Sequence, residues 1–218
     1  IHLNFRISAI FKDKVFSDKG TMFTTQIQEF IDEGDIFMST NFNKSNFFST
    51  ISNLTNDKLS DLTENIDSIA SYVLQTKPQT KVKIFNAFEK QFLRFNLSQQ
   101  DFIHVKKRIK FFSKFLFSSG AKRLILPNKK NSIVNNSDEL DKALESLRKN
   151  DLQMLSVHGM SSIPMGKQRK NFFNSDGRST KFTNLYGVDA SVLPSNIGES
   201  PQGTIMAFSH EIIKRMKI

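Results

Sequence analysis

The longest amphipathic stretch of the chain lies at residues 98–120, and it constrains the fold more than any other stretch. Its apolar residues recur at the spacing of one helical face: Val105, Ile109, Phe112 and Leu116. Ser98 with Asp101 three residues later forms an N-capping pattern, and Gly120 suits a helix end. We therefore predict a helix over 98–119 whose apolar face is buried against another layer of the protein.

Segments in which apolar and polar residues alternate predict that layer as a sheet. The clearest is residues 3–11, where Phe5, Ile7 and Ala9 alternate with more polar neighbours. The other expected strands are 22–30, 36–39, 69–76, 81–88 and 123–126. A second helix is expected over 137–148, with Leu140, Ala143, Leu144 and Leu147 facing inward. The predicted fold class is α+β, an antiparallel sheet with helices packed on one face.

Two polar regions between these elements are less regular. Residues 41–55 are rich in Asn, Ser and Phe without a clear period, which predicts a loop, and residues 57–67 have a helical composition. The formal net charge of +10 admits a partner such as nucleic acid or an acidic membrane surface. The basic residues are scattered, however, and Lys, Asn, Ile and Phe together are typical of AT-rich coding. We therefore expect no nucleic-acid partner.

Several classes of site and location are disfavoured by the residue inventory. The chain has no cysteine, and its four histidines lack the spacing of a metal pair, so we expect no metal site. Apolar runs are far shorter than the ~20 residues of a membrane span, and no secretory signal is visible. We therefore expect a soluble protein, with the cytoplasm as the first candidate location. The first residue is Ile, which favours a fragment of a longer protein.

The C-terminal third contains a pattern of strand, irregular loop and helix. The expected strand surrounds Tyr186 and Val188, and Gly198 and Gly203 bracket the loop. The helix that follows places its apolar residues on one face: Ile205, Phe208, Ile212 and Met216. This arrangement would direct backbone N–H groups and the positive end of a helix dipole toward a ligand outside the fold.

The same stretch resembles the C-terminal signature of the glucose–methanol–choline flavoprotein oxidoreductases. The resembling residues are Asn184-Leu185-Tyr186, Val188-Asp189-Ala190-Ser191-Val192-Leu193-Pro194 and Pro201-Gln202-Gly203-Thr204-Ile205-Met206-Ala207. His158-Gly159-Met160 to Met165-Gly166 resembles the histidine motif of that family, and Asp176-Gly177-Arg178 lies between the two. The likeness is dense over 155–210 and looser over 1–150.

This resemblance implies a division of the chain and a cofactor. Residues 1–150 would form a substrate-binding (cap) domain, and residues 151–218 a flavin-contacting and catalytic segment that completes an FAD-binding domain. No Gly-x-Gly occurs in the chain, so the dinucleotide fingerprint is absent. We therefore expect the FAD-binding βαβ unit to lie upstream, as a partner domain in the same protein, and the isolated chain to be inactive.

The resemblance also implies the site residues. On its own, a histidine after an expected strand at 153–157 would be structural, as we expect His104 and His210 to be surface residues. The family match instead makes His158 the catalytic base. Ser200 takes the second catalytic position, where the family commonly has Asn or His; Asn196 and Glu199 are nearby alternatives. The cofactor-binding residues would be Asp189, Ala190, Pro201, Gln202 and Gly203.

The expected activity is oxidation of the CH–OH group of a small-molecule alcohol. A base near neutral pKa takes the hydroxyl proton, and imidazole suits that task. The flavin takes the hydride, and a second polar group aims the alcohol oxygen. Two alternatives stay open: a non-redox lyase of the same family, and a basic module that binds polyanions.

Overall fold

The computed structural model describes residues 1–218 except 20, 22, 41–59, 61, 131, 169–170 and 217–218. Its centre is a sheet in the order β2-β3-β4-β1-β7-β8, in which every neighbouring pair is antiparallel. The strands are β1 (Leu3–Ile10), β2 (Gln26–Ile27), β3 (Asp35–Thr40), β4 (Ile69–Thr76), β7 (Arg123–Ile125) and β8 (Ile133–Val134). The predicted α+β class with an antiparallel sheet is confirmed.

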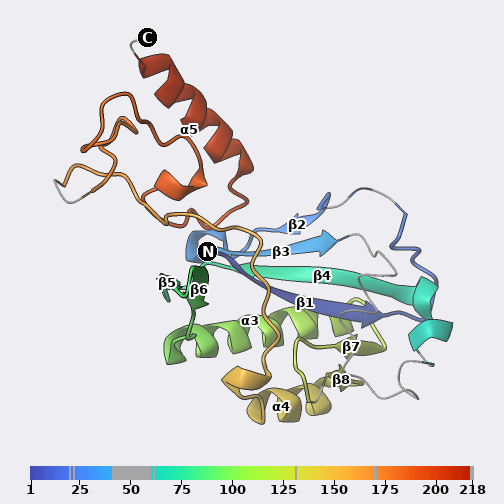
Figure 1. Ribbon diagram of the computed structural model, residues 1–218. Coiled ribbons are helices and arrows are strands. Elements are labelled where there is room, and N and C mark those ends of the chain that lie inside the picture. Colours follow the sequence, from blue (N-terminus) through green and yellow to red (C-terminus); the bar gives the residue numbers. More distant parts are fainter. Residues whose placement is uncertain are drawn as a thin grey trace.

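Helices α3 (Gln99–Ser118) and α4 (Ser137–Glu145) lie together on one side of this sheet (Figure 1). The predicted cap is present, since Ser98 Oγ accepts the Asp101 N–H at 3.0 Å. At the start of α4, the side chain of Asn136 accepts the Glu139 N–H. Short 3-10 turns complete the described elements: η1 (Ile31–Glu33), η2 (Ile66–Ser68), η3 (Lys149–Asp151) and η4 (Ala190–Val192). The final helix, α5 (Gln202–Arg215), lies apart from the sheet.

The core lies between the sheet and α3. Phe5 and Ile7 of β1 and Ile109 of α3 are completely buried, and the ring of Phe37 stacks on Phe112 with centroids 4.4 Å apart. The whole predicted stripe of α3 belongs to this cluster. On folding, each side chain of this stripe moves from water into contact with apolar neighbours. Burial of such a side chain stabilises the fold by about 1.5–3 kcal/mol.

The other face of the sheet is polar although it is also buried. Side chains alternate between the two faces of a strand, so Asn4 and Ser8 of β1 point away from α3. Their β4 partners in the register are Gln75 and Ser71, and the hydroxyls of Ser8 and Ser71 lie 2.7 Å apart. All four side chains are buried. The sheet therefore offers hydrogen-bonding groups on the face opposite its hydrophobic core.

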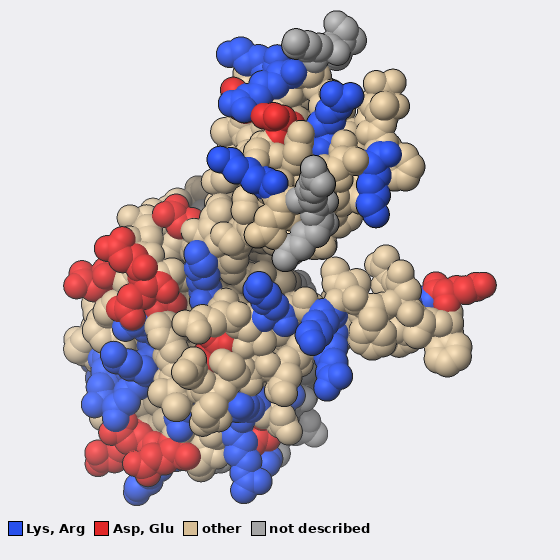
Figure 2. Space-filling view, turned by 90° about the vertical axis from the view of Figure 1, so that its left-hand side faces the viewer, with Lys and Arg blue, Asp and Glu red and all other residues tan. Residues whose placement is uncertain are grey.

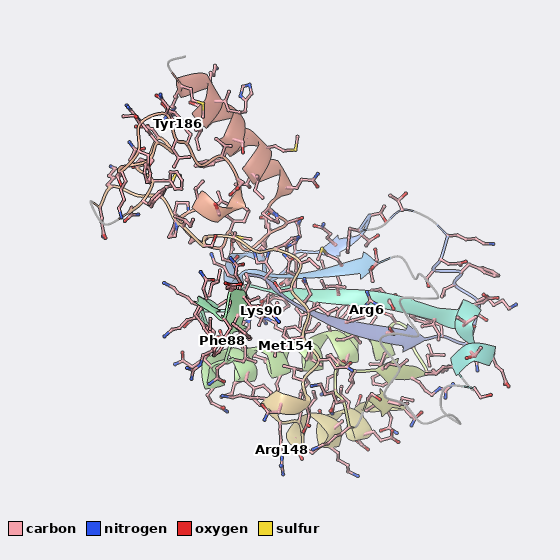
Figure 3. The ribbon with its side chains drawn as sticks, viewed as in Figure 1. Arg6, Phe88, Lys90, Arg148, Met154 and Tyr186 are labelled. Carbon is pink, nitrogen blue, oxygen red and sulfur yellow. The ribbon has the colours of Figure 1, made fainter. Side chains whose placement is uncertain are left out.

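Two predicted strands differ from the structure. The strand expected over 22–30 is reduced to Gln26–Ile27, because the Gln28 carbonyl accepts the Ile31 N–H and turns the chain into η1. The strand expected over 81–88 is not part of the main sheet. It appears as β5 (Lys83–Ala87), which pairs with β6 (Lys90–Arg94) in a separate hairpin. Phe88 lies at the turn of this hairpin (Figure 3).

The hairpin turn explains why β6 was not anticipated. Phe88 and Glu89 both have positive φ, at 50° and 60°, where Asn-Gly is the usual pair.

The predicted loop at 41–55 lies outside the described residues. So does most of the helix expected over 57–67; of that stretch, residues 60 and 62–64 are described and are helical, and η2 follows at Ile66–Ser68.

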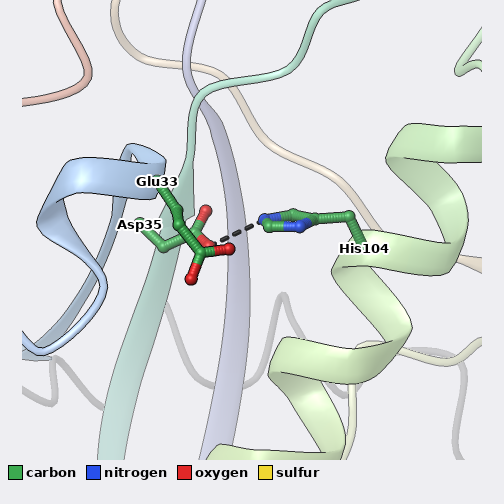
Figure 4. A group of neighbouring side chains, drawn as sticks. All are labelled: Glu33, Asp35 and His104. Atoms are coloured by element: carbon green, nitrogen blue, oxygen red, sulfur yellow. Dashed lines mark hydrogen bonds and ion pairs between the residues drawn. The ribbon is translucent and has the colours of Figure 1, made fainter.

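A buried ion-pair cluster fixes α3 to β3, and it corrects the expectation that His104 is a surface residue. Asp35 is fully buried, and its carboxylate lies 2.7 Å from His104 Nε2 (Figure 4). The same carboxylate lies 2.6 Å from Arg108 Nε. Arg108 also pairs with Glu33 at 2.5 Å. Glu33, Asp35 and His104 have the atom types of a metal site within 4.8 Å of one another, but the Arg108 guanidinium occupies the position facing both carboxylates.

Basic side chains are spread over the face shown in Figure 2, with acidic groups between them. They do not form a continuous stripe on that face. Within the described parts of the chain, no helix combines the length and the apolar character needed to cross a membrane.

Candidate functional site

On its way to the C-terminal segment, the chain contacts β1, a central strand of the sheet. The strand expected at 153–157 is absent: Leu155 forms one isolated bridge with Asn4, and Leu152 forms another with Asn128. Met154, on this path, packs against the core (Figure 3). Val157, just before the histidine motif, is exposed. The segment therefore touches the sheet at single points and leaves it before His158.

The histidine motif and the Asp189 segment lie side by side. Three backbone hydrogen bonds of 3.0 Å join them, from the N–H groups of Ser161, Ile163 and Met165 to the carbonyls of Ala190, Ser191 and Val192. The carboxylate of Asp189 accepts the Ser191 N–H at 2.7 Å and so caps η4. The hydrogen bonds hold the carbonyl of Ala190 toward Ser161. Asp189 itself is an exposed residue.

The strand expected around Tyr186 is also absent. Tyr186 forms a single bridge with Arg178 and is half-buried in the C-terminal segment (Figure 3). Gly177 has a φ of 72° and packs closely against α5. A Cβ added at this position would lie 2.6 Å from Ile212 Cδ1. A glycine is therefore needed there for α5 to dock, and Ile212 is the buried residue of the predicted α5 stripe.

The start of α5 is open to a ligand. Gln202, Gly203 and Thr204 are exposed, Pro201 is buried, and no side chain caps the helix. No acidic residue occurs in its first turn, and nothing lies within 4 Å of a Cβ added at Gly203. Free N–H groups and the positive end of the dipole favour a negatively charged or acceptor group at this position.

His158 meets a residue that sequence analysis did not select. Its Nδ1 lies 2.9 Å from Nδ1 of His2, which is fully buried just before β1. Nε2 of His2 lies 3.2 Å from the backbone N of Gly198. His2 thus connects the histidine motif to the loop that leads to Ser200. The alternation of β1 could have indicated it, because His2 shares the polar face of Asn4.

Both imidazoles are kept in the neutral form by their surroundings. Burial, followed by repulsion from His158, lowers the pKa of His2 to about 4. Burial likewise lowers the pKa of His158. A neutral imidazole retains one ring nitrogen that can accept a proton, which is the state a base requires.

Ser200 stands differently from His158. It is exposed, and among the described contacts no hydrogen bond joins its hydroxyl to His158. Its loop is nevertheless fixed close by: Gln75 Nε2 donates to the Gly198 carbonyl at 3.4 Å, and Asn196 binds the Ile1 carbonyl. His210 is exposed on α5, as expected.

The lowered pKa of His2 predicts a loss of stability in mild acid. The unfolded chain takes up a proton on His2 near pH 6.5, but the folded protein does so only near pH 4. Between these values the unfolded state binds more protons, so the free energy of unfolding falls as the pH falls. Urea titrations from pH 7 to pH 4 measure this slope, and His2→Gln should flatten it. An equal slope in His2→Gln would contradict the prediction.

Comparison with known proteins agrees with this layout. The GMC oxidoreductase family model matches residues 89–209, more than half of the 218-residue chain. An uncharacterized GMC-type oxidoreductase, y4nJ, of Sinorhizobium fredii (strain NBRC 101917 / NGR234) is 26% identical over 220 residues. That match covers 97% of this chain and 42% of the relative, so the chain spans less than half of the relative's length.

Solved structures show the same fold. Pyridoxine 4-oxidase from Mesorbium loti matches with a TM-score of 0.57 at 14% identity, over 98% of this chain and 42% of that one. A formate oxidase variant from Aspergillus oryzae RIB40 matches with a TM-score of 0.59 at 12% identity, over 98% and 45%. With the family model covering the histidine motif, the Asp189 segment and the start of α5, the chain belongs to the GMC oxidoreductase family.

Proposed function

We propose that this chain is the C-terminal part of an FAD-dependent oxidoreductase that acts on the CH–OH group of an alcohol. The observation that carries the proposal is the attachment of His158, through His2, to the loop before Ser200 and α5. This attachment supports a site formed by His158, the loop that leads to Ser200 and the start of α5. Residues 1–150 would bind the substrate, and residues 151–218 would complete the flavin site.

The residues at the start of α5 fit a flavin. The uncapped N–H groups of Gln202 and Gly203 have no competing carboxylate, so they suit the acceptor edge of a flavin ring and the negative charge of its reduced form. When bound, the flavin supplies the hydride acceptor. Asp189 and Ala190 would contact the same cofactor, and the unit that binds its pyrophosphate would come from outside this chain.

The remaining chemistry would be carried by this chain's own side chains. Nε2 of His158 would take the hydroxyl proton of the alcohol, because Nδ1 is engaged with His2. The Ser200 hydroxyl, which can both donate and accept, would hold the alcohol oxygen.

The structural neighbours support a redox activity over the lyase alternative. One is a pyridoxine 4-oxidase, and FAD modification is described for the formate oxidase. The spread of charge in Figure 2 does not favour the alternative of a basic polyanion-binding module.

The direct test uses the complete protein that contains this chain. We expect the purified protein to show the absorbance of an oxidised flavin, and we expect a panel of primary and secondary alcohols to include one that bleaches it without oxygen. A colourless protein would contradict the cofactor assignment. A flavin that no alcohol or aldehyde hydrate reduces would contradict the reaction and favour the lyase alternative.

The role of Ser200 predicts a small effect on rate. Ser200→Ala removes one neutral hydrogen bond, worth roughly 0.5–1.5 kcal/mol, so flavin reduction should slow by up to about tenfold. Ser200→Asn restores the residue type common in the family and should recover the rate. Ser195→Ala, in the same exposed loop, serves as the matched control. Equal rates for Ser200→Ala and Ser195→Ala in stopped-flow reduction would remove Ser200 from the site.

A further inference from the structure

The contact between His2 and His158 contains a proton whose position is constrained. Two Nδ1 atoms 2.9 Å apart leave room for one hydrogen between them. One ring must therefore donate and the other accept. When His158 has taken up a proton, both of its nitrogens carry hydrogen, so His2 must be the acceptor and must hold its own hydrogen on Nε2.

We propose that His2 is a positioning residue for His158: its Nδ1 accepts the Nδ1–H of the His158 ring and leaves Nε2 of His158 as the nitrogen that takes up a proton. This inference rests on the proposed role of His158 as the base. In this arrangement His2 orients the ring of the base and stabilises the imidazolium that forms on it, without contacting the substrate itself.

The loop at Asn196–Gly198 is suited to the outer nitrogen of His2 in either tautomer. The side-chain amide of Asn196 hydrogen bonds with His2, and its Oδ1 can accept an Nε2–H. The Gly198 N–H lies 3.0 Å from the same Oδ1 and 3.2 Å from Nε2 of His2. When Nε2 is bare it can accept from Gly198, and when it is protonated Gly198 keeps Asn196 as its partner. The loop can therefore accommodate a hydrogen on Nε2 of His2, which is the state that the proposal requires.

The charges around His2 keep it an acceptor. Besides His158, the ionisable side chain acting on it is Lys77, which is positive and adds to burial in disfavouring a second positive charge. His2 is fully buried, whereas His158 is only half-buried. The positive charge of the pair is thus placed on His158, the ring nearer to solvent.

Nitrogen NMR of the complete protein labelled with ¹⁵N-histidine tests the pairing without measuring activity. In the wild type, the ring nitrogens of His2 should shift when His158 titrates. In His2→Phe, which keeps a ring but removes the acceptor, the pKa of His158 should fall because its imidazolium loses a hydrogen bond. His2→Gln, whose amide oxygen can accept, should restore most of the wild-type value, and His210→Phe should change nothing.

The kinetic readout uses the same variants. Hydrogen bonds to charged groups are among the stronger ones, so flavin reduction at neutral pH should slow at least about tenfold in His2→Phe and less in His2→Gln. The proposal is overturned if the pKa of His158 is the same in wild type and His2→Phe. It is also overturned if the ¹⁵N chemical shifts of His2 do not change when His158 titrates. Should His2→Phe fail to fold, the wild-type spectra alone decide. If NMR coupling is present but His158→Ala reduces flavin normally, the proposed base role fails and the pairing stands.

Discussion

Replacing His158 by Ala is expected to slow reduction of the flavin about 10²–10⁴-fold, which is the usual contribution of a general base. The physical reason is that the hydroxyl proton of the substrate would then have no acceptor of suitable pKa at the site. Flavin should stay bound, because the start of α5 and the Asp189 segment do not depend on the imidazole. Anaerobic stopped-flow measurements with a reactive alcohol give the rate, and the visible spectrum gives the flavin content.

His210→Ala is the matched control, since His210 is an exposed histidine on α5. If His158→Ala reduces flavin at the wild-type rate, His158 is a structural partner of His2 and the site assignment is wrong. Loss of flavin together with loss of rate would instead give His158 a role in holding the segment against residues 190–192.

The second large effect is expected for Asp35→Asn, which should lower the free energy of unfolding by about 3–5 kcal/mol. Asp35 is fully buried and neutralises Arg108, whose side chain is also almost completely buried. Breaking a buried ion pair leaves a charge in a poorly solvated place, and that desolvation cost accounts for most of the loss. Glu33 still contacts Arg108, but it is largely exposed and its attraction is screened.

Urea denaturation of Asp35→Asn and of Asp141→Asn measures this effect against an internal control. Asp141 pairs with Lys110 on the surface of the same region, with both side chains substantially exposed. Its replacement should leave the midpoint nearly unchanged, because exposed ion pairs contribute little. Similar midpoints for the two variants would mean that the buried cluster does not hold α3 on the sheet.

The elements predicted correctly are those whose signals lie within a few residues. The helix at 98–119 was correct to within a residue, since both its apolar spacing and its cap at Ser98 are local. Strands β1, β3 and β4 were correct because one face of each packs against the apolar core, which favours apolar residues at alternate positions. The strands expected at 153–157 and around Tyr186 failed because those segments make isolated bridges, and burial does not impose a period on them.

The α+β class, the long capped helix and the motifs that place the chain in its family could all be predicted from the amino-acid sequence. These features depend on the spacing of residues that are close together in the sequence and on short motifs of recognisable residue types. Three pairings could be recognised only in the folded structure: β5 and β6 form a separate hairpin, Asp35 contacts His104 and Arg108, and His2 contacts His158 although 156 residues separate them. Such pairings are set by which faces of distant elements are buried together. Buried polar groups select partners by proximity in space, and no local pattern encodes that proximity.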